Sequence, residues 1–341
     1  MKQAKKPNGK PLKWSYRIAI VIVSLFAFWS VCFWLMDLDV KTDFKPGATF
    51  SVPYAQELGL DPMEVLNASL DDLKIRYFRI PAYWSLLQPK NDGFDWTVLD
   101  RQLDAIASRG GKVTLAIGQK LPRWPECWMP DWVMQLSETE RETALKRYLT
   151  ATVERYKNHP AVDMWQVENE AHFPFGTCPA YRSDLLDEEL ALVRALDNTK
   201  PIATTDSGEL SFWSIGRKVD QLGTSVYRVV VSPVGVFRYW FLPPQLYLRK
   251  AQILGWLMGF KHVYVSEFQM EPWVKTTIPQ STLEEQSKTM DLKQFNDNIR
   301  FAKRMGMERV DFWGVEWWYW LKTKLDMPQY WEGAKTLYAN P

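Results

Sequence analysis

Histidine and cysteine are scarce in this chain, with three of each among 341 residues. A structural zinc site takes four His or Cys ligands at close spacing, and a disulfide-stabilised scaffold needs a denser set of cysteines. The short supply of both residues argues against zinc modules, histidine-rich metal centres and disulfide-dense scaffolds. We therefore expect no metal ion and no cofactor.

Several catalytic signatures are also missing. The sequence contains no G-x-S-x-G, no P-loop and no H-E-x-x-H motif, so the enzyme classes that carry these motifs have no support. The composition excludes a disordered chain, because 46% of the residues are hydrophobic and only 24% are charged.

Acidic residues are absent from positions 1–17, which carry six basic side chains. The remaining residues hold 36 basic and 40 acidic side chains, so the formal net charge of +2 combines a basic tail with a mildly acidic remainder. A protein that binds nucleic acid carries its basic patch on the folded part. Nucleic acid is therefore not an expected partner.

The 19 residues from Ile18 to Met36 contain no charge and would span about 28 Å as a helix. Basic residues precede this stretch and acidic residues follow it, so the positive-inside rule places the N-terminus in the cytoplasm. We predict a basic tail at 1–17, a transmembrane signal-anchor at 18–36 and an extracytoplasmic domain at 37–341. A cleaved signal peptide and a buried core helix are the alternatives, and the first lacks the small residues expected before a cleavage site.

Short apolar runs alternate with helix-like stretches after residue 42. Eight such strand–helix units predict one (β/α)8 (TIM) barrel. An open doubly wound sheet is the alternative, but it commonly carries a glycine-rich phosphate turn, which is missing here. The predicted strands lie at 48–54, 74–81, 112–118, 162–169, 201–206, 222–227, 262–268 and 309–315, and the predicted helices at 63–72, 97–109, 138–157, 183–196, 211–220, 245–259, 289–305 and 329–338.

Residues 229–260 differ from the rest of this domain because they are aromatic and contain several prolines. The simpler interpretation is a long loop followed by the sixth helix of the barrel. An apolar lid over the site, or a surface that contacts the bilayer, is the alternative.

Active sites of such barrels lie at the C-terminal ends of the strands. The fourth and seventh predicted strands both end in an acid, Glu170 after Asn169 and Glu267. These strands lie three steps apart around the ring, so the two carboxyl groups are expected to face each other across the barrel mouth. Paired carboxylates suit glycoside hydrolysis, in which one acid protonates the leaving oxygen and the other attacks the sugar or activates water.

Tryptophan is abundant, with 18 residues. An indole ring packs flat against the apolar face of a pyranose, so tryptophans in loops after strands indicate a sugar-binding cleft. An oligo- or polysaccharide is therefore the expected substrate. The tryptophans placed in or near such loops are Trp124, Trp128, Trp132, Trp273, Trp317, Trp318 and Trp320.

The segments WQVENEA (165–171), SEF (266–268) and WGVEWWYW (313–320) resemble glycoside hydrolase clan A. The segment YFRIPAYWSLLQPKNDGFDWTVLD (77–100) resembles the second-strand region of family 5 (cellulase-like) and family 42 members. The resemblance covers roughly residues 45–338. It implies a retaining (β/α)8 glycosidase with an acid/base Glu after Asn on strand four and a nucleophilic Glu on strand seven.

By this resemblance Glu170 is the acid/base and Glu267 is the nucleophile. Asn169 would bind the sugar 2-hydroxyl, Arg79 would keep Glu267 ionised, and Tyr227 would donate a hydrogen bond to the same carboxylate. The other substrate-binding candidates are Trp317 as the sugar platform with Trp313 as its alternative, Gln119 where family 5 members usually carry a histidine, and His172 two residues after the acid/base.

Two of the cysteines follow neighbouring predicted strands, Cys127 the third and Cys178 the fourth. Loops on one face of a barrel can meet, and a domain outside the cytoplasm lies in an oxidising compartment. We therefore predict a disulfide between Cys127 and Cys178.

Together these features predict a cell-membrane protein with a cytoplasmic N-terminus, in which a retaining glycosidase acts on an extracytoplasmic glycan. The lipid bilayer is the expected partner of residues 18–36. A non-catalytic glycan-binding protein on a barrel that has lost its activity is one alternative. A transglycosylase with the same residues is another.

Overall fold

The computed structural model describes residues 14–36, 43–179, 182, 184–208, 211–232, 235–260 and 262–339. The chain forms two compact units, Met1–Asp39 and Val40–Pro341. Most of the basic tail predicted at 1–17 lies outside the described residues.

The described part of the first unit is one helix, α1 (Trp14–Met36). Its side chains from Ile18 to Val31 are exposed. Among the residues that the structure describes, no helix combines the length and the apolarity needed to cross a membrane. The structure therefore gives no support to the transmembrane helix predicted at 18–36.

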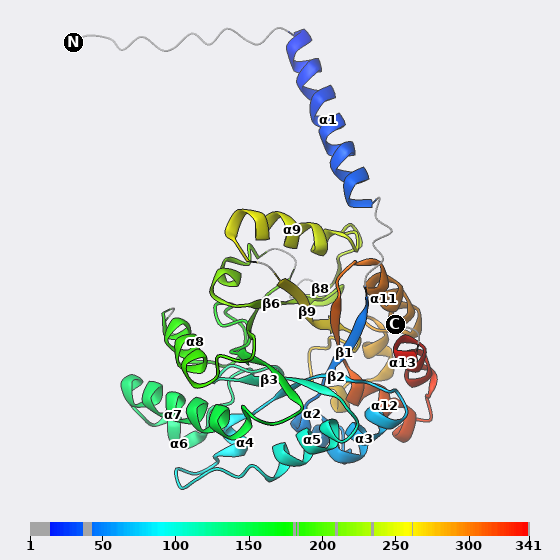
Figure 1. Ribbon diagram of the computed structural model, residues 1–341. Coiled ribbons are helices and arrows are strands. Elements are labelled where there is room, and N and C mark those ends of the chain that lie inside the picture. The colour runs from blue at the N-terminus through cyan, green and yellow to red at the C-terminus, as the bar shows by residue number, and fades with distance from the viewer. Residues whose placement is uncertain are drawn as a thin grey trace, which may run out of the picture. The chain divides into compact units, whose positions relative to one another are not determined.

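The second unit contains a closed barrel of eight parallel strands (Figure 1). The strands follow chain order around the ring and the last closes on the first, which confirms the predicted (β/α)8 barrel and excludes the open sheet. The strands are β1 (Lys45–Thr49), β2 (Tyr77–Pro81), β3 (Lys112–Ile117), β4 (Val162–Val167), β5 (Ile202–Asp206), β6 (Gln221–Val226), β9 (His262–Gln269) and β10 (Arg309–Trp313).

Helices surround the barrel, and local signals set their ends. Asp61 accepts hydrogen bonds from the N–H groups of Met63 and Glu64 and so caps α3. Ser137 and Glu140 form the capping box that begins α7. The α-helices are α2 (Val52–Glu57), α3 (Pro62–Asp71), α4 (Trp84–Leu87), α5 (Thr97–Ala107), α6 (Asp131–Met134), α7 (Glu138–Tyr156), α8 (Leu185–Leu196), α9 (Leu246–Met258), α10 (Leu283–Ser287), α11 (Leu292–Arg304), α12 (Val315–Lys324) and α13 (Gln329–Ala339), and the 3₁₀ helices are η1 (Ser214–Lys218) and η2 (Ile278–Gln280).

The structure differs from the sequence prediction at both ends of the barrel. The first strand ends at Thr49, because Ser51 caps α2 and Pro53 stands in its first turn, where proline favours a helix start. The last strand ends at Trp313, and the tryptophan-rich stretch after it is the helix α12 rather than a loop. The helix predicted at 211–220 is only the short η1.

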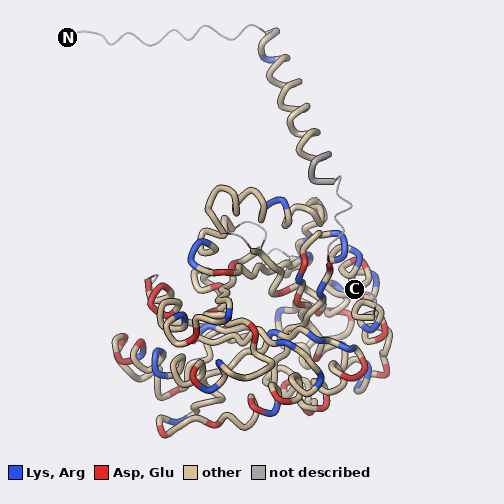
Figure 2. Tube along the Cα trace, viewed as in Figure 1, with Lys and Arg blue, Asp and Glu red and all other residues tan. Residues whose placement is uncertain are grey.

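The aromatic segment 229–260 begins with an antiparallel hairpin, where a loop was predicted. The hairpin consists of β7 (Val229–Ser232) and β8 (Gly235–Arg238), and α9 follows as the predicted sixth helix. Figure 2 shows acidic and basic residues interspersed along most of the barrel unit, whereas α9 is uncharged apart from one short basic stretch.

Candidate active site

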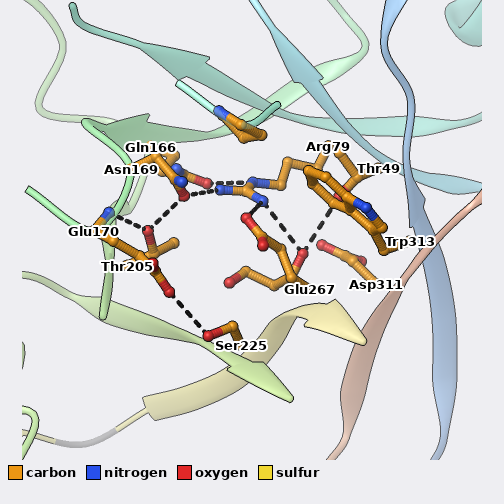
Figure 3. A network of polar contacts seen from close by, with 12 residues as sticks. Thr49, Arg79, Gln166, Asn169, Glu170, Thr205, Ser225, Glu267, Asp311 and Trp313 are labelled. Carbon is orange, nitrogen blue, oxygen red and sulfur yellow. Dashed lines mark hydrogen bonds and ion pairs between the residues drawn. The ribbon is translucent and has the colours of Figure 1, made fainter. Parts of the chain in front are cut away.

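Arg79 on β2 is fully buried and joins the ends of β4 and β9 (Figure 3). Its Nη1 lies 2.7 Å from Glu267 Oε1, and its Nη2 lies 2.6 Å from Asn169 Oδ1. Its Nε lies 2.6 Å from Gln166 Oε1. Burial alone would lower the pKa of Arg79, but the charge of Glu267, its hydrogen bond, and the nearby Tyr264 and Asp311 together outweigh burial, and the pKa is raised. A permanent cation therefore holds the two strand ends in register.

Glu267 on β9 is held at both carboxylate oxygens. Arg79 donates to Oε1, and the hydroxyl of Tyr227 donates to Oε2 at 2.9 Å. Burial, and then the charge of Glu267, raise the pKa of Tyr227 well above its ordinary value, so the phenol keeps its proton. The structure therefore brings together the three residues that the resemblance had grouped.

Glu170 follows β4 in a left-handed backbone conformation with a φ of 47°. Its N–H donates to Thr205 Oγ1 at 2.8 Å, and the Thr205 hydroxyl donates to Asn169 Oδ1 at 2.9 Å. The hydroxyl of Ser225 donates to Glu170 Oε1 at 2.9 Å. Residues other than glycine rarely adopt this conformation, so β5 and β6 supply the contacts that hold a strained turn in place (Figure 3).

The carboxyl group of Glu170 favours its protonated form. Burial is the largest effect and raises its pKa, and the negative charge of Glu267 raises it further, to about 8. The hydrogen bond from Ser225 and the charge of Lys120 act in the opposite direction. A carboxyl that keeps its proton at neutral pH is suited to act as a general acid.

Glu126, in the loop after β3, is a third buried acid at this site, and no motif in the sequence points to it. Its Oε2 accepts a hydrogen bond from Asn169 Nδ2 at 3.2 Å. Burial, and then the charge of Glu267, raise the pKa of Glu126 to about 7. Its φ is 72°, and an irregular loop of this kind leaves no periodic pattern in the sequence. Only its position after a barrel strand could have drawn attention to it.

Glu168 anchors the loop that carries Glu126. Its buried carboxylate accepts hydrogen bonds from the N–H groups of Gln119 at 2.8 Å and Lys120 at 2.7 Å. Gly118 permits this approach, because a Cβ at that position would lie 2.4 Å from Glu168 Oε1. Glu168 therefore supports the site instead of facing the substrate.

A cavity of about 850 Å³ opens beside the paired acids. Glu126 and Tyr227 line it, whereas Glu170 and Glu267 are not among its lining residues. Glu267 adjoins the wall through its hydrogen bond from Tyr227. The volume is typical of small-ligand sites. Among the described residues, no group of His, Cys, Asp or Glu is arranged to hold a metal ion. The tryptophans in the wall are Trp124, Trp128, Trp273 and Trp313.

The sugar platform predicted at Trp317 is wrong. The strand β10 ends at Trp313, Gly314 turns the chain with a φ of 136°, and α12 then carries Trp317 into the core. Trp317 is 1% exposed, and its Nε1 donates to Gln286 Oε1 at 2.9 Å. The alternative, Trp313, lines the cavity and donates from Nε1 to Glu271 Oε1 at 2.8 Å.

Arg123 covers part of Trp313. Its guanidinium carbon lies 4.1 Å from the Trp313 ring centroid and 3.6 Å from that of Tyr54. The guanidinium pairs with Glu271 and, at 3.5 Å, with Glu316. Burial alone would lower the pKa of Arg123, but these two acids outweigh burial and raise it. This side of the cavity therefore presents charges that are already paired.

Of the predicted substrate-binding residues, only Tyr227 and Trp313 line the cavity, and Arg79, Asn169, Trp317, Gln119 and His172 do not. Gln119 lines a small separate pocket beside Glu142 and Arg182. Its backbone carbonyl accepts a hydrogen bond from the N–H of Trp128. This hydrogen bond closes the loop between the two residues, and Glu126 in that loop lines the cavity. His172 is exposed and does not line the cavity wall.

A disulfide joins Cys127 and Cys178. Cys127 lies in the loop after β3, and Cys178 lies in the loop after β4. The N–H of Thr177 also donates to the carbonyl of Pro125 at 2.9 Å. The two loops, which both contribute side chains to the cavity, therefore form one connected wall.

Comparison with known sequences finds a match to part of the chain. Residues 67–184 match the glycoside hydrolase 42 family, described as β-galactosidase. A β-galactosidase of Geobacillus kaustophilus is 33% identical over 104 residues, which cover 26% of this chain and 16% of that protein. The chain thus matches about a sixth of the length of this relative. The matched family region includes Arg79, Glu126, Asn169 and Glu170 but not Glu267.

Solved structures share the fold over most of the chain. Xylanase 10B from Thermotoga maritima has a TM-score of 0.55 at 14% identity, and the match covers 87% of this chain and 95% of the xylanase. The protein GH5_18 from Bifidobacterium longum subsp. longum has a TM-score of 0.56 at 12% identity, with 80% and 70% of the two chains covered. The chain is therefore a (β/α)8 barrel with the fold of these glycoside hydrolases, and residues 67–184 resemble the glycoside hydrolase 42 family.

Proposed function

We propose that this protein is a retaining β-glycosidase that residues 18–36 attach to a membrane. The observation that carries the proposal is the asymmetry of the two carboxyl groups. Glu267 receives hydrogen bonds from a permanent cation and from a phenol, while Glu170 is buried and its pKa is raised to about 8. An acid held by a cation and a neighbouring acid whose raised pKa favours its protonated form suit the roles of nucleophile and general acid.

In the first step the carboxylate of Glu267 attacks the anomeric carbon of the substrate. The bond to the leaving oxygen breaks, and Glu170 transfers its proton to that oxygen. In the second step water attacks the anomeric carbon of the glycosyl-enzyme and gives a proton to Glu170, which releases Glu267 as a carboxylate. Asn169 is held by Arg79 and Thr205. Its amide, which donates to Glu126 in this structure, would bind the sugar 2-hydroxyl.

The substrate class follows from the cavity and from the relatives. The cavity wall combines four tryptophans with the acid Glu126, which suits the apolar face and the hydroxyl groups of a sugar. The family model and the curated relatives are β-galactosidases, so β-galactosides are the first substrates to test. Because the match to these relatives is short, the test panel should also include other β-glycosides.

The direct test is hydrolysis of a panel of aryl β-glycosides by the full chain in detergent. We expect Glu267→Gln to abolish turnover and Glu170→Ala to slow it strongly. On an aryl glycoside with a good leaving group, added azide should restore the Glu170→Ala rate, because azide attacks the glycosyl-enzyme without needing a general base and forms a glycosyl azide. Circular dichroism controls for folding. Full activity of Glu267→Gln would refute the nucleophile assignment, and glycan binding without hydrolysis would favour the non-catalytic alternative.

Membrane attachment is supported by the uncharged stretch 18–36 behind six basic residues, and this charge bias favours a barrel outside the cytoplasm. The test is alkaline carbonate extraction of cell membranes, combined with protease treatment of intact spheroplasts. An anchored protein stays in the pellet and is digested from outside. Release into the supernatant would contradict the anchor.

A further inference from the structure

The segment from β8 to the end of α9 exposes a group of large apolar side chains. Two of its tryptophans are among the most exposed residues described, Trp240 at 82% and Trp256 at 84%. A group of exposed apolar side chains on a folded domain commonly marks an interaction surface. We define the apolar face as Phe237, Trp240, Phe241, Ile253, Trp256 and Leu257.

Helix α9 differs in this respect from other helices around the barrel. Four of its positions are exposed. Three of them, Ile253, Trp256 and Leu257, follow the i, i+3, i+4 spacing of a single helix face and are apolar, and the fourth is Gln252. Helix α7 provides the comparison, because its outward positions are polar. These include Thr143, Arg147, Glu154 and Arg155.

The part of the apolar face on and after β8 is a connected aromatic cluster. The ring centroid of Phe241 lies 6.5 Å from that of Phe237 and 5.8 Å from that of Trp240. The chain then enters α9 through a compact turn, in which the N–H of Leu246 donates to the carbonyl of Pro243. The six side chains therefore come from one contiguous stretch of the fold.

The charge around the apolar face has one sign. The sequence contains no Asp or Glu from Gln221 to Ser266, although the chain has 40 acidic residues in total. The same stretch contains five basic residues, which are Arg228, Arg238, Arg249, Lys250 and Lys261. Figure 2 shows the resulting absence of acidic colour along α9.

We infer that the apolar face inserts into the interfacial region of an anionic phospholipid bilayer. Tryptophan and phenylalanine beside aliphatic residues and basic side chains form the composition typical of interfacial membrane segments, and the positive charge complements anionic headgroups. A glycan-binding surface would instead present several acidic or amide groups to sugar hydroxyls. The sequence from Gln221 to Ser266 has no acid, and Gln252 is the one exposed amide side chain of α9.

This surface would fix the position of the cavity relative to the lipid. Val231 and Ser232 of β7 line the cavity, while Phe237 on the paired strand β8 belongs to the apolar face. Insertion of the face therefore holds one wall of the cavity close to the headgroups. The inference rests on the barrel unit alone, and it extends the proposed function by placing the substrate near the membrane surface.

The experiment uses the full chain carrying Cys32→Ser, with one added cysteine labelled by an environment-sensitive fluorophore. Leu257→Cys reports the apolar face. Arg101→Cys, at an exposed position of α5, is the matched control. Each protein is mixed with vesicles of phosphatidylcholine alone or of phosphatidylcholine with one-third phosphatidylglycerol. Each type of vesicle is prepared with and without a lipid-attached quencher. Flotation of the vesicles then separates bound from free protein.

We expect the label at position 257 to shift to the blue and to be quenched several-fold more strongly than the label at position 101. The effect should be larger with phosphatidylglycerol and should fall in Trp240→Ser/Trp256→Ser. Vesicle-bound protein with equal signals at both positions would overturn the inference while leaving the anchor intact, and protein that does not float would overturn both. A blue shift that grows with protein concentration without lipid would indicate self-association and overturn the inference. Hydrolysis of aryl glycosides by the same samples reports separately on the glycosidase.

Discussion

At the scale of single residues, the site is an arrangement of three acids around one cation. Glu126, Glu170 and Glu267 lie close enough for the charge of Glu267 to raise the pKa of the other two. Arg79 binds Glu267 and Asn169 directly. The balance among these groups sets which carboxyl holds a proton. Removing a group that lowers the pKa of Glu170 and removing one that raises it should therefore move the pH profile of activity in opposite directions.

Replacing Ser225 by Ala should move the alkaline limb of kcat/KM to higher pH. The Ser225 hydroxyl donates to Glu170 and lowers its pKa, and Glu170 must be protonated to act as the acid. Loss of a hydrogen bond worth about 1 kcal/mol corresponds to about 0.7 pH units. A pH–rate profile measures the shift, with Ser225→Thr as the control that keeps a hydroxyl. An unchanged limb would mean that Glu170 is not the group that titrates.

Replacing Glu126 by Gln should move the same limb to lower pH. The negative charge of Glu126 raises the pKa of Glu170, and the amide removes that charge while keeping the shape. We also expect KM to rise, because Glu126 lines the cavity. The profile is compared with that of Ser225→Ala, and a shift in the same direction for both variants would contradict this electrostatic account.

At the scale of elements, the sequence was most informative where residues follow a regular strand. Arg79, Asn169, Glu170, Tyr227 and Glu267 lie at or near strand ends, and the structure gathers them at one site. The position of a single tryptophan was harder to predict. Whether Trp313 or Trp317 reaches the cavity depends on where β10 stops, and the φ of 136° at Gly314 decides that.

Irregular loops carried less information than strands. Arg123 and Glu126 reach the cavity through positive φ angles of 85° and 72°, which no hydrophobic period predicts. The β7–β8 hairpin was likewise interpreted as a loop, because its apolar residues do not alternate with polar ones. The closed order of eight strands could be predicted because strand and helix patterns repeat along the whole domain.

Breaking the disulfide between the two cavity loops should affect substrate binding more than chemistry. The bond closes a loop of 51 residues, so its loss in Cys127→Ser/Cys178→Ser should destabilise the barrel by roughly 2–4 kcal/mol. KM should rise several-fold with a smaller change in kcat, because the wall loosens while the strand ends keep Glu170 and Glu267. Steady-state kinetics and denaturant unfolding measure both effects. Equal losses in kcat and KM, or no loss of stability, would contradict this role.

At the scale of the whole molecule, buried acids make stability depend on pH. The pKa of Glu126, Glu168 and Glu316 is raised to about 7, with burial the largest cause in each. The folded state therefore keeps protons that the unfolded state has already lost above about pH 4.3. Because the folded state binds more protons in this window, the free energy of unfolding falls as pH rises.

We therefore expect the Tm of the barrel to fall between about pH 5 and pH 8. Differential scanning calorimetry across this range measures the slope. Asp72 does not contribute in this window, because the hydrogen bond from Lys335 and further contacts lower its pKa to about 2. Glu126→Gln should flatten the slope, and a Tm that rises over the same range would contradict the assignment of these buried acids.

The central claim is that Glu267 forms a covalent bond to the sugar during turnover. The most direct measurement is to incubate the protein with an activated 2-deoxy-2-fluoro-β-glycoside of a sugar it hydrolyses, and to map the trapped adduct by peptide mass spectrometry. We predict one added fluorosugar per chain, located on Glu267 and absent from Glu267→Gln. An adduct on another residue, or steady turnover of the parent glycoside with no adduct at all, would contradict the account.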